Sequence, residues 1–192
     1  ISGKVNPSGK LATTFPASYN DEASAKNFPG KEFSDKAITG MFGMKQVPAE
    51  VTYYEGIYVG YRYFNSFSVK PAYEFGYGMS YTNFKYSPVE LNASSFDGKI
   101  TAKVTITNTG KMSGKEVAQL YLSAPQGKLD KPSEELKGFA KTGLLQPGKS
   151  ETITFTLNPD DLASFDTNTS SWIADAGNYK VSIGASSLDI KS

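Results

Sequence analysis

The clearest pattern in the chain is an alternation of apolar and polar residues in its second half. In residues 99–107 and 152–157 every second position is apolar, and the positions between are mostly threonine or lysine. The apolar members are Ile100, Ala102, Val104 and Ile106, followed by Ile153, Phe155 and Leu157. Because successive side chains of a strand point to opposite faces, this period predicts strands with one buried face.

Shorter runs of the same kind predict further strands. Residues 116–123 have one apolar face, and residues 134–145 are expected to form a bent strand. Residues 171–174 and 178–185 are expected to close the fold as a hairpin. The side chains expected to point inward are Ala118, Leu120, Leu122, Leu136, Phe139, Leu144, Tyr179, Val181 and Ile183.

About seven short strands separated by turn signals predict an all-β fold for the second half of the chain. We expect residues ~84–192 to form a β-sandwich of the immunoglobulin or fibronectin type III kind, preceded by an extended linker. The one helical signal there is a single turn at 158–162, where Asn158 suits the cap and Pro159 the first helical position.

The first half of the chain reads differently. Residues 1–16 contain a turn at 6–9 and a short extended run, with too few apolar residues for a domain. Residues 17–50 have no sustained period, and phenylalanine, isoleucine and methionine are scattered among turn formers. A linker that lies across a neighbouring surface fits this pattern better than a loop inside a compact domain. The start at Ile1, without an initiator methionine, suggests a processed or excised chain.

The stretch from Tyr53 to Tyr81 holds most of the twelve tyrosines. Residues 57–64 are apolar or aromatic at both alternating sets of positions, which predicts a strand covered on both faces. Stacked aromatics with planar polar groups can bind a sugar, but interfaces between domains use the same residue types. The candidate residues for either role, with the interface preferred, are Tyr53, Tyr54, Glu55, Tyr58, Tyr61 and Arg62.

Glu55 is the carboxylate of greatest interest, because it lies among aromatics with Arg62 close in sequence. A buried or half-buried ion pair that holds the linker is the structural interpretation of this pair. The neighbouring pairs Glu134–Glu135 and Asp160–Asp161 are expected on solvated faces, since adjacent side chains of a strand point apart. A retaining glycosidase needs two carboxyls about 5–5.5 Å apart, and adjacent residues do not supply them.

Composition narrows the function further. The chain has no cysteine and no histidine, which excludes thiolate chemistry, Ser-His-Asp catalysis and histidine-based zinc sites within it. A net charge of +1 without a basic stripe argues against nucleic-acid binding, and no apolar run is long enough to span a membrane.

Residues 166–171 begin like a calcium loop but lack its glycine, so a hairpin loop is expected. Trp172 is expected to pack at a sandwich edge or hairpin. We expect no cofactor, no metal and no catalytic residue.

Six motifs in order resemble the C-terminal part of family 3 glycoside hydrolases, the β-glucosidase and β-xylosidase group. They cover nearly the whole chain apart from about residues 17–50. The motifs are NPSGKLATTFP (6–16), YYEGIYVGYRYFN (53–65), FGYGMSYTNFKYS (75–87), EVAQLYLSAP (116–125), EELKGFAKTGLLQPGKSETITFTL (134–157) and WIADAGNYKVSIGASS (172–187).

This resemblance implies that the catalytic residues lie outside the chain. In the family a barrel domain carries the aspartate nucleophile and an α/β sandwich domain usually carries the acid/base glutamate. The implied boundaries are 1–16 for the end of the α/β sandwich, 17–75 for the inter-domain linker and 76–192 for the fibronectin type III-like domain. The implied partners are the two catalytic domains and, through the whole enzyme, a β-glucoside or β-xyloside.

Two alternative functions belong to other classes of protein. A free carbohydrate-binding module requires a row of exposed aromatics on one sheet face, and the strands between 99 and 157 show mostly threonine, lysine and serine there. An adhesion or assembly module would use the aromatic linker as its partner surface.

A secreted or periplasmic location is expected over a cytoplasmic one. Asn92 and Asn168 stand in glycosylation sequons, which matter only in a secreted eukaryotic protein.

Overall fold

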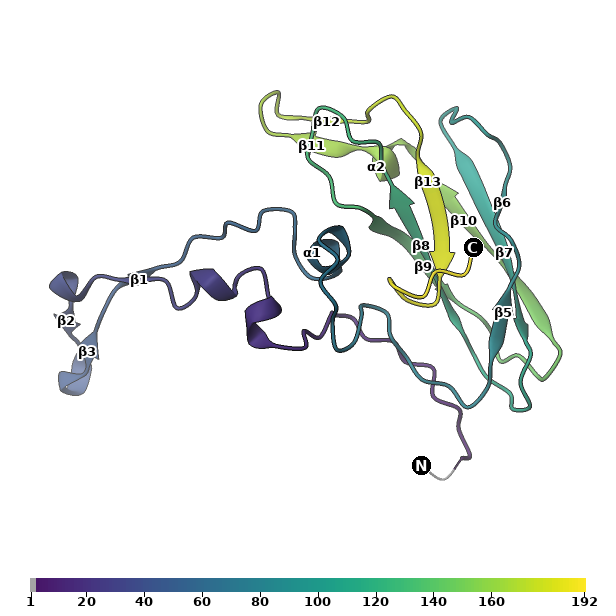
Figure 1. Ribbon diagram of the computed structural model, residues 1–192, viewed down its shortest axis with the longest axis horizontal. Helices are drawn as coiled ribbons and strands as arrows, with labels where there is room; N and C mark the ends of the chain where they lie inside the picture. The colour runs from purple at the N-terminus through teal and green to yellow at the C-terminus, as the bar shows by residue number, and fades with distance from the viewer. Residues whose placement is uncertain (1–2) are drawn as a thin grey trace.

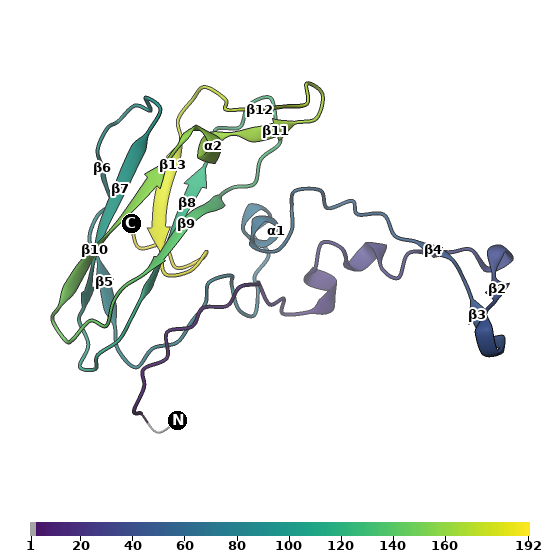
Figure 2. The same cartoon turned by 180° about the vertical axis from the view of Figure 1, so that it is seen from behind.

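The computed structural model describes residues 3–192, which form a β-sandwich and an arm that projects from it (Figure 1). Figure 2 shows the molecule from behind, and in both views the arm leaves on the side of helix α1 (Tyr61–Ser66). The strands of the sandwich are β5 (Phe84–Tyr86), β6 (Glu90–Leu91), β7 (Ile100–Asn108), β8 (Val117–Ser123), β9 (Glu135–Lys141), β10 (Ser150–Leu157) and β13 (Lys180–Gly184).

Two antiparallel sheets enclose a common core. In one sheet β7 pairs with β10 along one edge and with β5 and β6 along the other. The second sheet has the order β13-β8-β9. Between β7 and β10, Ile153 lies opposite Val104 and Phe155 opposite Ala102, so the two apolar sets share a face. The expected all-β sandwich is confirmed.

The inward faces predicted for β7, β8 and β10 are also confirmed. Ala102 and Ile106 from the first sheet, and Ala118 and Leu120 from the second, have no exposed surface. The remaining buried apolar side chains of the core are Tyr86, Ile100, Val104, Leu122, Leu145, Ile153, Phe155, Leu157, Leu162, Ile183 and Ala185. Burial of apolar surface is the main stabilising contribution to such a domain.

The inward orientation predicted within residues 134–145 is wrong for all three side chains, because Leu136 pairs with the outward Tyr121 and the other two face solvent. Phe139 is 72 % exposed and Leu144 is 58 % exposed, while Leu145 is buried. The cause is a bulge in β9: Leu136 pairs with Tyr121 and Gly138 with Leu120, so one residue is left over between them. An extra residue reverses the alternation of faces beyond it. The core therefore receives Ala140, and Gly138 lies against Phe155.

The expected closing hairpin is wrong as well. Strand β12 (Ser171–Ile173) pairs with β11 (Ser164–Asp166), whereas β13 pairs with β8. The residues between β12 and β13 connect the two sets of strands, and the carboxylate of Asp175 in this connection lies 2.8 Å from the Lys131 ammonium of another loop.

The small elements before and within the β11–β12 hairpin follow their sequence signals. Helix α2 (Pro159–Leu162) begins with proline, and the carboxylate of Asp161 accepts the backbone N–H of Asn158 at 2.7 Å. In the hairpin loop the carboxylate of Asp166 accepts the backbone N–H of Asn168 at 2.9 Å. The predicted helical turn and hairpin loop are confirmed.

The arm leaves the sandwich after residue 16 and returns at α1. It contains four single-turn 3₁₀ helices and two strand pairs of two residues each. Their bounds are Tyr19–Asp21, Ala25–Asn27, Ser34–Lys36 and Met41–Gly43 for the 3₁₀ helices, and β1 (Lys31–Glu32) with β4 (Ala49–Glu50) and β2 (Ile38–Thr39) with β3 (Lys45–Gln46) for the strands.

Large apolar side chains on the arm face solvent. Phe42 at its tip is 91 % exposed, and its neighbours Met41 and Met44 are 76 % and 61 % exposed. None of the residues between 17 and 60 is buried. No helix within residues 3–192 combines the length and the apolar character that a membrane span requires.

Candidate functional site

The expected strand over residues 57–64 is wrong, because the chain forms helix α1 from Tyr61 to Ser66. Gly60, with φ of +57°, turns the chain into the helix in a conformation that side chains rarely adopt. Tyr61, Phe64 and Asn65 are spaced three and four residues apart and therefore share one helical face. Both alternating sets of positions are apolar here, so the period of two did not distinguish strand from helix.

Helix α1 covers the outer face of the second sheet. Gln119 and Tyr121 of β8 point away from the core, yet they are 3 % and 0 % exposed. The ring of Tyr61 packs edge-on against Tyr121, with centroids 5.9 Å apart, and lies 5.0 Å from the ring of Phe75. Phe64 is 1 % exposed. Strand β8 is therefore buried on both faces by residues of its own chain, whereas Phe139 on the outer face of β9 is exposed.

The residues under the helix make a hydrogen-bonded chain. The hydroxyl of Tyr121 donates to Oε1 of Gln119 at 2.6 Å, and the amide nitrogen of Gln119 donates to the Ala185 carbonyl at 2.8 Å. Gly76 lies directly above this glutamine, and a Cβ at Gly76 would collide with the amide group. Burial raises the pKa of the Tyr121 phenol, which keeps it neutral and able to donate.

Polar contacts fix α1 to the start of β9. The backbone N–H of Leu136 donates to the Tyr61 hydroxyl at 2.8 Å, and the amide of Asn65 donates to Oε1 of Glu134 at 2.6 Å. The guanidinium of Arg62 lies 3.4 Å from the carboxylate of Glu135. The expected ion pair between Glu55 and Arg62 is therefore wrong, and so is the solvated setting expected for Glu134 and Glu135.

Several groups around α1 have raised pKa values, and for the Tyr61 phenol the main cause is burial. Burial raises the pKa of the Glu134 carboxyl, and the hydrogen bond from Asn65 opposes that shift. The hydroxyl of Tyr58 donates to Oδ1 of Asp130 at 2.6 Å, and this hydrogen bond raises the pKa of the phenol. Asn65 and Asp130 were not predicted from the sequence, and Glu134 and Glu135 were expected on solvated faces. The three-and-four spacing of Tyr61, Phe64 and Asn65 was the signal for a helix facing a partner.

Five of the six candidate residues fall into two sets, and Tyr53 belongs to neither. Tyr61 and Arg62 face the second sheet. Tyr54, Glu55 and Tyr58 line a hollow of about 360 Å³ at the root of the arm, beside Tyr63 and Phe67 of the α1 region. Tyr53 does not line that hollow and is 77 % exposed. Part of the aromatic stretch thus covers the chain's own sandwich, and part remains open to solvent.

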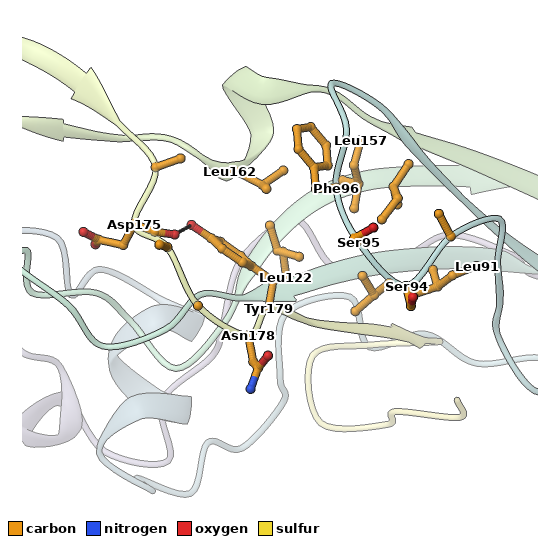
Figure 3. A pocket seen from close by; sticks show the side chains of 16 residues that line it. Leu91, Ser94, Ser95, Phe96, Leu122, Leu157, Leu162, Asp175, Asn178 and Tyr179 are labelled. Atoms are coloured by element: carbon orange, nitrogen blue, oxygen red, sulfur yellow. Dashed lines mark hydrogen bonds between the residues drawn. The ribbon is translucent and has the colours of Figure 1, made fainter.

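A second hollow, of about 580 Å³, lies at one end of the sandwich (Figure 3). Its walls are apolar core side chains, including Leu122, Leu157 and Leu162, below the loops at 91–96 and 174–179. The hydroxyl of Tyr179 donates to the Asp175 carbonyl at 2.9 Å, as the dashed line in Figure 3 marks. Asp175 is the one carboxylate of its lining, and the hydrogen bond from Lys131 lowers its pKa. A lone ion-paired carboxylate does not suit acid–base work.

Within residues 3–192, no three histidine, cysteine, aspartate or glutamate side chains gather in a way that would hold a metal ion. The exposed aromatic pair of the β11–β12 hairpin, Phe165 and Trp172, is packed edge to face with centroids 5.5 Å apart. The hairpin-packing role expected for Trp172 is confirmed.

Comparison with known proteins agrees with this architecture. A model of the fibronectin type III-like (Fn3-like) domain matches residues 116–187. Thermostable β-glucosidase B from Acetivibrio thermocellus is 39 % identical over 98 % of this chain and 23 % of its own length. The chain thus spans about a quarter of the length of the curated relatives it matches.

Solved structures give the same result. β-Glucosidase 3B from Thermotoga neapolitana in complex with glucose is 49 % identical, with a TM-score of 0.85 over 100 % of this chain and 24 % of that one. The GH3 β-glucosidase from Bifidobacterium adolescentis is 35 % identical, with a TM-score of 0.86 over 99 % of this chain and 26 % of that one. These matches extend across the arm, α1 and the sandwich together. The chain is the C-terminal, Fn3-like region of a family 3 glycoside hydrolase.

Proposed function

We propose that this chain is the non-catalytic part of a retaining β-glucosidase, and that its arm docks onto the catalytic domains of the same enzyme. The whole enzyme releases terminal β-linked glucose or xylose, and the nucleophile and acid/base lie in the other domains. Relatives named as β-glucosidases, one of them in complex with glucose, support the activity. A secreted or periplasmic location fits an enzyme that acts on such glycosides.

The observation that carries the docking proposal is the contrast between the two ends of the arm. Its root is held by the aromatic and polar contacts of α1 to β8 and β9. Its tip presents Met41, Phe42 and Met44 to solvent. Exposed apolar side chains gathered on one projecting segment are typical of a surface that another surface covers. A fixed root keeps that surface in one orientation, which lowers the entropy lost on docking.

Hydrolysis of p-nitrophenyl β-D-glucoside and β-D-xyloside tests the activity. The complete polypeptide is expected to hydrolyse at least one of them, and the 192-residue chain neither. Turnover by the isolated chain would refute the non-catalytic role. If the correctly folded complete polypeptide hydrolyses neither glycoside, the glycosidase proposal is refuted.

Substituting serine for Met41, Phe42 and Met44 together tests the docking. In the isolated chain the triple variant should unfold at the same temperature as the parent, because these side chains contact little. In the complete polypeptide it should lower the unfolding temperature or the rate of hydrolysis. Met112→Ser, at an exposed methionine of the sandwich, is the matched control and should change neither.

A further inference from the structure

The hollow at the root of the arm has an unusual combination of walls. One side comes from the 3₁₀ turns of the arm and the other from the segment that enters and leaves α1. Aromatic rings and charged groups both line it, among them Glu22, Lys26, Tyr54, Glu55, Tyr58 and Tyr63.

The carboxylate of Glu55 is incompletely compensated in this hollow. Its Oε2 atom is buried and accepts no hydrogen bond from any residue between 3 and 192. Among the ion pairs that the described residues form, none includes Glu55. Taking a carboxylate out of water without a partner is costly, so a cation beside it would stabilise the assembly.

The surrounding rings favour a cation as well. Tyr58 and Phe67 pack edge-on with centroids 4.8 Å apart, and Tyr63 lies 5.2 Å from Phe67. Ring faces attract cations, and a guanidinium both stacks on rings and pairs with a carboxylate through its planar fork. The lining carries two carboxylates, Glu22 and Glu55, against the single ammonium of Lys26. The excess of carboxylates and the ring faces together favour a guanidinium over an uncharged sugar.

The chain does not supply this guanidinium itself. Arg62 is its sole arginine, and that side chain is directed to Glu135 of β9. A guanidinium in the hollow has to come from another part of the enzyme. The adjoining arm carries the apolar side chains that the docking proposal assigns to the same interface.

We propose that the hollow binds an arginine side chain of the catalytic domains and that Glu55 is its ion-pair partner. The identity of the donor domain rests on the function proposed above. The binding chemistry of the hollow does not, because the 192-residue chain contains all of its walls. Glu55 is thus a residue of the domain interface and not of the sugar-binding site.

Titration of the isolated chain with small probes, followed by NMR, tests this chemistry. Methylguanidinium should shift the ring signals of Tyr54, Tyr58 and Tyr63 in a saturable way. Methylammonium and methyl β-D-glucopyranoside at the same concentration should shift them less. An equal response to methylammonium would overturn the preference for arginine. A stronger response to the glucoside would overturn the proposal in favour of a sugar site.

Two variants keep the test specific. Glu55→Gln keeps the shape of the side chain and should weaken methylguanidinium binding about tenfold. Tyr54→Ala, at a side chain that is 78 % exposed, removes a wall with little risk to folding and should also weaken it. Glu90→Gln on β6, outside the hollow, is the matched control and should bind like the parent. Parent-like affinity in Glu55→Gln would refute the role of the carboxylate.

The complete polypeptide supplies the second readout. Glu55→Gln should lower its unfolding temperature and leave kcat for the nitrophenyl glycoside unchanged. A fall in kcat without a change in unfolding temperature would assign Glu55 to the substrate and overturn the proposal. If the complete polypeptide proves inactive on both glycosides while the titration succeeds, the proposed function fails and the guanidinium site stands.

Discussion

Strand β8 of the second sheet and the arm both carry large apolar side chains outside the core, but only those of β8 are covered within the chain. On β8, Ala118 and Leu120 enter the core, while Tyr121 on the opposite face lies under α1. On the arm, Phe42 and Met41 have no such cover. An apolar pattern in the sequence therefore does not by itself mean burial within the same chain. The docking proposal assigns the cover of the arm to a domain outside the chain.

The largest expected effect comes from the covered region. Ile106→Ala removes a side chain with no exposed surface from between the sheets and should destabilise the chain by about 2–5 kcal/mol. Ile38→Ala, on the arm at 60 % exposure, should change the stability of the isolated chain by less than about 0.5 kcal/mol. Urea unfolding of both variants measures the contrast. Similar losses from the two would mean that the arm is covered in solution.

A smaller effect is expected where α1 joins the sheet. Asn65→Ala deprives the Glu134 carboxylate and the Ser187 carbonyl of a donor, and should cost about 1–3 kcal/mol. Asn168→Ala is the control, because the 2.9 Å hydrogen bond of Asn168 in the exposed hairpin loop is donated by its backbone N–H, which the substitution keeps. The same urea experiment applies. An Asn65→Ala variant as stable as the parent would mean that α1 rests on the sheet through its aromatic contacts alone.

Through the Glu134 carboxyl, the stability of the folded chain is expected to depend on pH. Because its pKa is raised in the folded chain, the folded state holds this proton more tightly than the unfolded state does. Its contribution to stability therefore falls as pH rises from the ordinary carboxyl value of about 4.3 through the raised value. Thermal unfolding of Glu134→Gln at pH 4 and pH 7 should show a more favourable difference from the parent at pH 7. The opposite order would show that the Asn65 hydrogen bond to the carboxylate outweighs burial.

The smallest expected effect lies on the β11–β12 hairpin. Trp172→Ala removes one ring of an exposed edge-to-face pair and should lower stability by about 0.5–1.5 kcal/mol. Phe165→Ala should have a similar effect, and the double variant should lose less than the sum. Additive losses would indicate that the two rings contribute to stability separately. A loss above about 3 kcal/mol would mean that the hairpin rings contribute as much to stability as buried core side chains do.

The strands with a single covered face were predictable from the sequence. Alternation along 99–107 and 152–157 identified their buried sides because β7 and β10 run without interruption. The same rule failed in β9, where the bulge before Gly138 turned Phe139 outward. A bulge depends on how two strands meet and leaves no mark on the alternation of one of them.

For the candidate site, the sequence predicted which types of residue gather there but not which of them contact one another. The residues around Glu55 were recognised as an aromatic cluster with a charge, and three of them do line one hollow. Arg62 was assigned to the wrong carboxylate, because Glu135 is distant in sequence and meets α1 only through the packing of the helix on β9. The helix itself was hidden because both alternating positions of residues 57–64 are apolar.

The way the two ends of the arm are fixed at its root determines how its length can change. Residues before the arm pair with residues after α1: the backbone N–H of Leu11 donates to Tyr77 and that of Phe15 to Tyr73, both at 2.8 Å. The arm is thus a closed loop whose two ends are fixed side by side. For such a loop the entropy of closure grows only with the logarithm of its length, by about 0.6 kcal/mol for each doubling. The segment between these ends can lengthen or shorten between related enzymes while the sandwich below it keeps its stability.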